Sequence, residues 1–348
     1  EIGQVVNLPA LAASLKIIAE KGRAGFYEGA LAEDMVGKLR ALGGCHTLDD
    51  FAAVACDYVT PTRTQYRGFD VLEIPPNGQG ITAQIALNIL QYFDLDVLDP
   101  HGALRFHLEM EASRLAYDLR DRHVADPAFV SVPVDELLSA EMAAKLAARI
   151  DPDQALTDLA ANRDPLNRDT IYLTVVDKDR NAVSFINSLY KGFGSGITGP
   201  ESGIVLHNRG AGFVLSDGHP NCLQGGKRPL HTIIPGMLVE KGRATLPFGV
   251  MGGAYQPVGH VHLLTNIIDF GMDVQEALDS PRVFPGAYGI EVEKGISAEV
   301  RAGLIARGHE VQNALLPFGG GQSIHIDWKN GALTGGSDPR KDGAAVGY

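Results

Sequence analysis

The chain has 348 residues, of which 45% are hydrophobic and 41 are glycine, so it can bury a substantial core that contains many tight turns. Its formal net charge of -12 argues against nucleic acid or an anionic membrane surface as a partner. No unbroken apolar run approaches the roughly twenty residues needed to span a bilayer, which argues against a membrane-spanning protein.

Before residue 170 the pattern of the sequence is mainly helical. Apolar residues three or four apart predict one helix behind Pro9 and another after the turn-like segment 75–78. The segment 67–74 between them has the composition of a strand. The two apolar helix faces consist of Leu8, Leu11, Leu15 and Ile18, and of Ile81, Ile85 and Ile89.

The segment 101–123 carries His, Glu and Arg at helical spacing, and His107 and Glu111 are conceivable metal ligands. Neither a paired second His nor a Cys cluster supports a metal, however. We therefore interpret this segment as a salt-bridged helix face.

The three cysteines, Cys45, Cys56 and Cys222, leave at least one thiol unpaired and lack the close spacing of metal ligands, so we expect buried or inert thiols. No secretion signal is visible, which favours a cytoplasmic protein. A periplasmic or secreted location stays open, because we expect the start of the protein to be missing from this sequence.

Two apolar runs separated by a polar turn predict a β-hairpin over residues 170–189. If Val176 faces Ala182 across the turn, counting outward along both strands sets Thr170 opposite Ser188. That register places two hydroxyl groups side by side at the open end of the hairpin.

Thr170 becomes a candidate nucleophile if the chain is cut between Asp169 and Thr170. A threonine hydroxyl needs a base to take its proton, and a neutral α-amine on the same residue can do so. The polar, turn-prone segment 164–168 is the best candidate boundary in the chain. We expect it to be a processing loop that separates subunits rather than domains.

Two glycine-rich segments follow the hairpin. The loop 192–199 matches the spacing of a dinucleotide fingerprint, but no helix opens after it, so we expect it to let the backbone pass close to a ligand or to another strand instead. Gly252 and Gly253 precede a run of helical spacing that begins near Pro257, and N–H groups at such a place can stabilise an oxyanion. A tight turn that needs two glycines is the simpler alternative for this pair.

Several motifs coincide in order: Thr170 with Val175-Val176-Asp177, Phe193-Gly194-Ser195-Gly196-Ile197, Glu201-Ser202-Gly203-Ile204, Lys227-Arg228-Pro229-Leu230, Gly252-Gly253 and Ser337-Asp338-Pro339-Arg340. In this combination the chain resembles the γ-glutamyltranspeptidase family of N-terminal-nucleophile hydrolases. The resemblance implies an α+β fold, a four-layered αββα sandwich, and no cofactor or metal. It also implies self-cleavage before Thr170, with residues 1–169 as the later part of a large subunit, whose first part is absent, and 170–348 as a small subunit. Together the two would form one domain.

Carried over by position, the resemblance makes Thr170 the nucleophile, Ser188 the supporting hydroxyl, and Gly252 with Gly253 the oxyanion hole. The chain departs from γ-glutamyl-specific members at the predicted substrate pocket: Tyr190 replaces Asn, Arg209 replaces Gln or Glu, Gly212 replaces the Asp that binds the glutamyl amine, and His231-Thr232 replaces a serine pair. Losing a carboxylate and gaining a guanidinium favours a plain anion over a zwitterion as substrate.

These departures resemble the acylase-like branch, which includes cephalosporin acylases and oxamate amidohydrolase. We therefore expect a self-processing threonine amidohydrolase that acts on an amide of a small anionic carboxylate, either oxamate-like or glutaryl-amide-like. A γ-glutamyltransferase or glutathione hydrolase is the alternative enzyme, and an unprocessed homologue that binds an anionic metabolite is the alternative outside enzymes. The expected partners are the two subunits from one precursor, with a dimer of the pair left open, and neither nucleic acid nor membrane.

Overall fold

The computed structural model describes residues 2–159, 169–286 and 289–348, which divide into two compact units. The smaller unit comprises residues up to Tyr58 together with 191–209. The larger unit comprises 59–190 and 210–348, so segments from both sides of Thr170 build it. The predicted processing loop, 164–168, lies outside the described residues.

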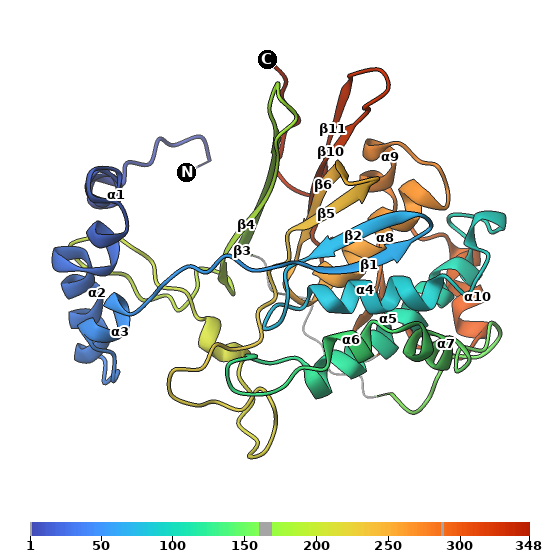
Figure 1. Ribbon diagram of the computed structural model, residues 1–348, viewed down its shortest axis with the longest axis horizontal. Helices are drawn as coiled ribbons and strands as arrows, with labels where there is room; N and C mark the ends of the chain where they lie inside the picture. Colours follow the sequence, from blue (N-terminus) through green and yellow to red (C-terminus); the bar gives the residue numbers. More distant parts are fainter. Residues whose placement is uncertain (1, 160–168, 287–288) are drawn as a thin grey trace. The chain divides into compact units, whose positions relative to one another are not determined.

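The smaller unit is helical in its first part (Figure 1). Its helices are α1 (Pro9–Tyr27), α2 (Gly29–Ala41) and α3 (Leu48–Ala52). The predicted helix behind Pro9 is confirmed, and Pro9 suits its first turn because a proline lacks the N–H that would be left without a partner there. Asp34 of α2 accepts the backbone N–H of Ser202 at 2.9 Å, which ties the segment 191–209 to this unit.

The glycine-rich loop 192–199 turns back on itself rather than opening a helix. A side chain at Gly194, where φ is +57°, would lie 2.4 Å from the carbonyl oxygen of Leu206. A β-bridge then joins Thr198 to Val205. Of the two expected uses of this loop, the close approach to another backbone segment is confirmed, and the loop lacks the helix that a dinucleotide site requires.

Strands from both sides of Thr170 form the sheets of the larger unit. Among the described residues, six strands pair antiparallel in the order β1-β2-β5-β6-β10-β11, β3 pairs with β4 in a hairpin, and β7, β8 and β9 form a further sheet. The bounds are β1 Thr62–Tyr66, β2 Phe69–Glu73, β3 Asp169–Val176, β4 Ala182–Tyr190, β5 Gly236–Glu240, β6 Arg243–Met251, β7 Val283–Gly286, β8 Gly289–Val292, β9 Val311–Asn313, β10 Gly320–Ile326 and β11 Leu333–Ser337. The strand predicted over 67–74 is thus shorter, because Arg67 and Gly68 form the turn from β1 to β2.

Helices α4 and α8 pack on the six-stranded sheet, and α5 packs against α4 (Figure 1). The helices of this unit are α4 Gly80–Leu90, α5 Ala103–His123, α6 Val134–Leu137, α7 Ala140–Ala147, α8 Gln256–Ile268, α9 Val274–Asp279 and α10 Ala298–Ala306, with short 3₁₀ turns at Leu95–Val97, Arg209–Gly212 and Gly253–Tyr255. The helix predicted from Ile81, Ile85 and Ile89 is confirmed, and α4 is buried along its whole length. No helix among the described residues combines the length and apolar character needed to cross a membrane.

The β3–β4 hairpin packs on the face of the sheet opposite α8. The ring of Phe248 in β6 lies 4.8 Å from the ring of His260 in α8. Because side chains alternate along a strand, Gly249 faces the other way, and there the ring of Tyr172 from β3 covers it. Helices, sheet and hairpin are therefore three successive layers of a mixed α/β structure. The fourth layer of the expected sandwich stays a prediction.

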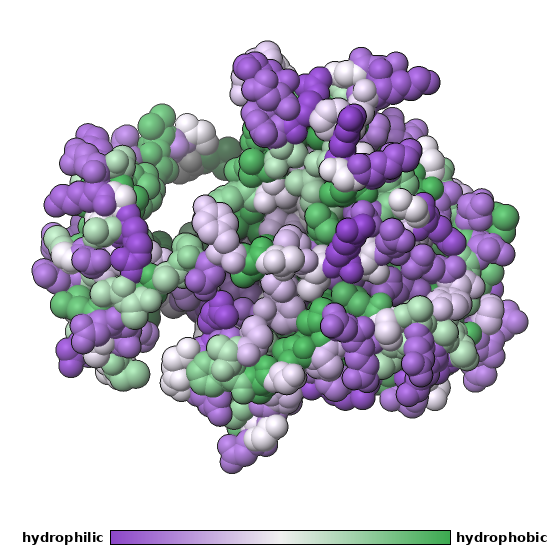
Figure 2. Space-filling model, viewed as in Figure 1, coloured by the Kyte–Doolittle hydropathy of each residue, from purple (hydrophilic) through white to green (hydrophobic). Residues whose placement is uncertain are grey.

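The outer face of the hairpin is apolar and exposed. Its large side chains are Ile171, Leu173 and Val175 in β3 and Val183 and Phe185 in β4, each more than two fifths exposed. In Figure 2 hydrophobic residues lie below the hydrophilic tip of this hairpin. The inner face, by contrast, carries the buried Thr170 and Tyr172.

The face of α5 that contains His107 and Glu111 is buried rather than solvated. Glu111 pairs with Arg114 at 2.6 Å, as the salt-bridge interpretation predicts. His107 donates from Nε2 to the carbonyl of Asp151 (2.8 Å), and its Nδ1 lies 2.7 Å from Nε2 of His309. Among the described residues no group of three or more His, Cys, Asp or Glu side chains could hold a metal ion.

Of the expectation of buried or inert thiols, the burial is wrong for two of the three cysteines. Cys45 and Cys56 are exposed, and Cys222 is partly buried. All three are free thiols. Cysteine is common in cores, but exposing its small side chain to water costs little free energy. Its burial therefore cannot be assigned from residue type alone.

The His107–His309 pair makes stability depend on pH. Burial, with further contributions from His107, Arg114 and Arg307, lowers the pKa of His309 to about 3. The unfolded chain takes up a proton near pH 6.5, so the free energy of unfolding should fall as the pH drops below that value, by about 1–2 kcal/mol between pH 6.5 and 5 for His309 alone. Urea unfolding at pH 7 and pH 5 measures the loss, which should be smaller in His309→Gln. An equal loss in both proteins would contradict this assignment.

Candidate active site

The hydroxyl groups of Thr170 and Ser188 lie side by side. The β3–β4 ladder pairs Val176 with Ala182 and Thr170 with Ser188, so the predicted register is confirmed. Thr170 Oγ1 and Ser188 Oγ are 3.0 Å apart, which is hydrogen-bonding distance. Thr170 is 5% exposed, so this contact is made almost without competition from water.

A β-bulge interrupts the ladder at the predicted cleavage position. Asp169 pairs with Tyr190, whereas Thr170 pairs with Ser188, so Leu189 is the extra residue. Tyr190 has a φ of +81°, which is uncommon for a residue with a side chain, and its N–H donates to Ser188 Oγ at 2.9 Å. Bulges of this kind are frequent beside active sites, where they re-aim a side chain.

Contacts between the hairpin and β6 place Thr170 toward the end of β6. Ser184 donates to the carbonyl of Phe248 (3.2 Å), and Tyr172, whose hydroxyl lies 2.7 Å from Ser184 Oγ, covers Gly249. Moving along β3 from Tyr172 to Thr170 therefore corresponds to moving along β6 toward Met251. Burial raises the pKa of Tyr172 well above its ordinary value, so this tyrosine stays a neutral packing group.

The two glycines directly after β6 form a tight turn that leads into α8. Gly252 and Gly253 have φ values of +133° and +58°, which side-chain-bearing residues rarely adopt. The N–H of Tyr255 donates to the carbonyl of Gly252 at 3.0 Å. Because the N–H and C=O of a trans peptide point in opposite directions, the Gly253 N–H points away from that bond. We call residues 252–255 the glycine turn.

The segment that contains His231 and Thr232 lies against the turn before α4. His231 forms a β-bridge with Gly78, and its carbonyl accepts the N–H of Gln79 at 3.0 Å. The side-chain amide of Gln79 donates to the carbonyls of Thr232 (2.8 Å) and Gly253 (2.9 Å). This fully buried glutamine therefore joins the His231–Thr232 segment to the glycine turn, a role that sequence reasoning missed.

Two further predicted pocket residues, Arg209 and Gly212, are the first and last residues of the 3₁₀ turn Arg209–Gly212. Arg209 is buried at the end of the segment that belongs to the smaller unit, with its N–H donating to His207 Nδ1 at 3.1 Å. Gly212, in the larger unit, accepts a hydrogen bond from Asn221 Nδ2 at 2.7 Å, and a side chain there would lie 3.1 Å from the carbonyl of Leu230. The assignment of Tyr190, Arg209 and Gly212 to a substrate pocket remains a prediction.

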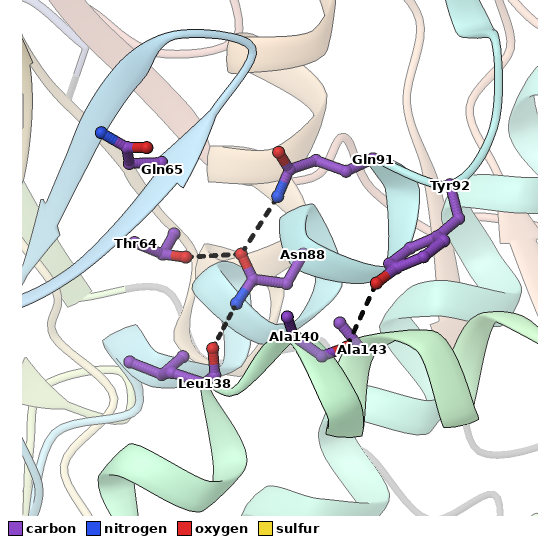
Figure 3. Close-up of a pocket in the computed structure, with 8 residues that line it drawn as sticks. All are labelled: Thr64, Gln65, Asn88, Gln91, Tyr92, Leu138, Ala140 and Ala143. Carbon is purple, nitrogen blue, oxygen red and sulfur yellow. Dashed lines mark hydrogen bonds between the residues drawn. The ribbon is translucent and has the colours of Figure 1, made fainter.

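A groove of about 380 Å³ lies elsewhere in the larger unit (Figure 3). Asn88 stands at its centre and bonds to Thr64, Gln91 and the carbonyl of Leu138. These polar groups are already hydrogen-bonded to one another. None of the lining residues belongs to the predicted site. The groove is therefore a structural junction between β1, α4 and the segment that leads into α7.

The chain belongs to the γ-glutamyltranspeptidase family. The family model for gamma-glutamyltranspeptidase matches residues 1–348, which confirms the resemblance carried by the motifs.

Similar proteins include hydrolases and an acylase. A glutathione hydrolase-like YwrD proenzyme of Bacillus subtilis (strain 168) is 40% identical over 97% of this chain and 65% of its own length. An oxamate amidohydrolase proenzyme of Klebsiella pneumoniae is 35% identical over 99% of this chain and 66% of its own length. The crystal structure of a cephalosporin acylase from Bacillus halodurans matches with a TM-score of 0.91 and 39% identity, over 99% of this chain and 64% of that one. The chain thus spans about 65% of the length of the YwrD-like relative.

The close contact between Tyr172 and Gly249 should be sensitive to one methyl group. A Cβ at Gly249 would lie 2.4 Å from the tyrosine ring, so Gly249→Ala should displace the hairpin and lower the free energy of unfolding by about 1–3 kcal/mol. Urea denaturation measures the loss. Gly225→Ala is the matched control, since a Cβ there meets no atom within 4 Å, and it should change stability by no more than about 0.5 kcal/mol. Equal effects of the two substitutions would disprove the packing argument.

Proposed function

We propose that this chain is part of a self-processing amidohydrolase that cleaves an amide bond of a small carboxylate-bearing substrate through an acyl-threonine intermediate. The observation that carries the proposal is the contact of 3.0 Å between Thr170 Oγ1 and Ser188 Oγ, directly beside the Asp169–Thr170 bond. The Ser188 hydroxyl can hold the buried Thr170 hydroxyl in orientation, and the α-amine that cleavage would free is the base that can activate it.

Processing is proposed at the bond between Asp169 and Thr170, which would leave a large subunit ending at Asp169 and a small one beginning at Thr170. The bulge at Leu189, opposite this bond, supports the choice because it breaks the regular ladder there. Relatives named as proenzymes support self-cleavage in the family.

The reaction would proceed by acyl transfer in two stages. Thr170 Oγ1 attacks the amide carbonyl carbon, and the new α-amine takes the hydroxyl proton and passes it to the leaving nitrogen. The N–H groups of Gly252 and Gly253 would stabilise the oxyanion. Water then adds to the ester carbonyl while the α-amine takes one of its protons; the acid leaves as the C–O bond to threonine breaks, and the amine passes that proton to the threonine oxygen.

The proposed substrate is an anion, with oxamate-like and glutaryl-like amides as the candidates. The chain has Gly212 where γ-glutamyl-specific members place an amine-binding carboxylate, and Arg209 adds a guanidinium near that position in the sequence. The net charge of -12 means that a local cation has to attract an anionic substrate. Relatives named oxamate amidohydrolase and cephalosporin acylase support this class.

A γ-glutamyl substrate is the second candidate. It is favoured by the relative named glutathione hydrolase-like, which is 40% identical to this chain. The two candidates differ in the amine that a γ-glutamyl group carries and a glutaryl group lacks.

The proposed fold is the four-layered αββα sandwich. The exposed apolar outer face of the β3–β4 hairpin supports it, because a sheet face of that composition is stable when a further layer covers it.

Substitution of the proposed nucleophile should stop both reactions. In the precursor that carries this chain, Thr170→Ala should remain a single species by mass spectrometry and lose hydrolysis by about a thousandfold or more. Thr174→Val is the matched control on the same strand and face, and it should be cut into two species that meet at Thr170. A cut, active Thr170→Ala protein would remove Thr170 from the mechanism, and an uncut wild type would favour a binding protein.

A panel of three amides should separate the substrate classes. The processed protein is assayed on oxamate, a glutaryl amide and a γ-glutamyl anilide. Because the amine-binding carboxylate is replaced by Gly212, kcat/KM for one of the first two should exceed that for the γ-glutamyl compound by about tenfold or more. Fastest turnover of the γ-glutamyl anilide would select the alternative function instead.

A further inference from the structure

Gln79 occupies a position between two parts of the proposed site. It immediately precedes α4 and is fully buried. Its amide Nε2 donates to two backbone carbonyls, those of Thr232 and Gly253, which lie 153 and 174 residues away in the sequence. This side chain therefore bridges two irregular segments, and the neighbouring Gln256 Oε1 adds a second link by accepting the N–H of Ile234 at 3.1 Å.

Two side chains of α5, Arg120 and Tyr117, contact Gln79 and the glycine turn respectively. Arg120 Nη1 donates to Gln79 Oε1 at 2.7 Å, and an arginine can only donate. The amide oxygen must therefore face Arg120, which leaves Nε2 toward the two carbonyls. Arg120 also lies over the ring of Tyr117 at 4.6 Å, and the Tyr117 hydroxyl donates to the carbonyl of Ala254. The carbonyls of Gly253 and Ala254 are thus both held by buried side chains.

We propose that Gln79 is a positioning residue that couples the His231–Thr232 segment to the glycine turn, so that the substrate pocket and the oxyanion donors keep one fixed spacing. This inference rests on the proposed function, because it assigns a role to the glycine turn in catalysis. Gln79 acts through the backbone of Gly253 and Thr232, and it touches neither Thr170 nor the reacting atoms.

The physical reason is the cost of removing a buried hydrogen-bond donor. If the Gln79 amide is lost, the carbonyl of Gly253 keeps only the N–H of Gln256, the carbonyl of Thr232 loses the Gln79 amide, and the backbone shifts in response. A shift of about 1 Å at an oxyanion hole costs up to about a hundredfold in rate. Turnover should therefore fall through the glycine turn, and KM should change through the movement of Thr232.

Two variants of the full precursor test the proposal. Gln79→Leu removes all three hydrogen bonds, and Gln79→Glu keeps the volume and the Arg120 contact but replaces the amide donor. Both should raise hydrogen–deuterium exchange in the peptides that cover 229–234 and 250–256. Per mole of processed Thr170 chain, both should lower kcat about ten- to a hundredfold and change KM.

Gln84→Leu is the matched control. Gln84 is another buried glutamine of α4, and its Nε2 donates to the carbonyl of Val71 at 3.0 Å, away from the site. This variant should lose comparable stability but keep kcat and KM, with unchanged exchange in both peptides.

The outcomes separate the two hypotheses. Unchanged exchange in both peptides of the Gln79 variants overturns the positioning role, whatever the activity. Raised exchange with normal kcat and KM limits Gln79 to a structural role and also overturns it. If the wild type hydrolyses none of the three amides, the proposed function fails, and the exchange data still decide whether Gln79 couples the two segments.

Discussion

The position of the β3–β4 hairpin on the sheet depends on the missing side chain at Gly249. Phe248 points toward α8, so the next residue of β6, Gly249, lies on the opposite face of the strand. Because Gly249 has no side chain, the ring of Tyr172 occupies the space there. The same contact places Ser184 against the carbonyl of Phe248. Thr170 lies two residues from Tyr172 on the same face, so its location relative to β6 follows from this one close packing contact.

Irregular backbone around the candidate site is held by buried side chains rather than by sheet ladders. Gln79, Arg120 and Tyr117 reach carbonyls of the glycine turn and of Thr232 from the helical layer. These carbonyls lie in turns or loops outside the sheet ladders, and that of Gly253 also accepts the backbone N–H of Gln256. A proposed oxyanion hole made of backbone N–H groups is only as well oriented as the peptides that carry them, which explains why the helical layer contributes polar groups here.

Local patterns predicted the elements that depend on neighbours in the chain. The register of Thr170 opposite Ser188 followed from the period of two and the turn length, and the helix containing Ile85 followed from its apolar spacing. Patterns could not reveal the bulge at Leu189, because the extra residue is tolerated only where the surrounding structure holds it. They also failed for Cys45, whose exposure depends on packing and not on residue type.

The sequence by itself determined the family, the hairpin with its two hydroxyl-bearing residues, and the glycine pair before a helix, because each depends on residue types at short, fixed spacing. Tertiary structure alone decided which distant groups meet. His107 contacts His309 across 202 residues, and Gln79 reaches Gly253 across 174. Such contacts depend on how layers stack in three dimensions, and a single sequence carries no spacing rule for them.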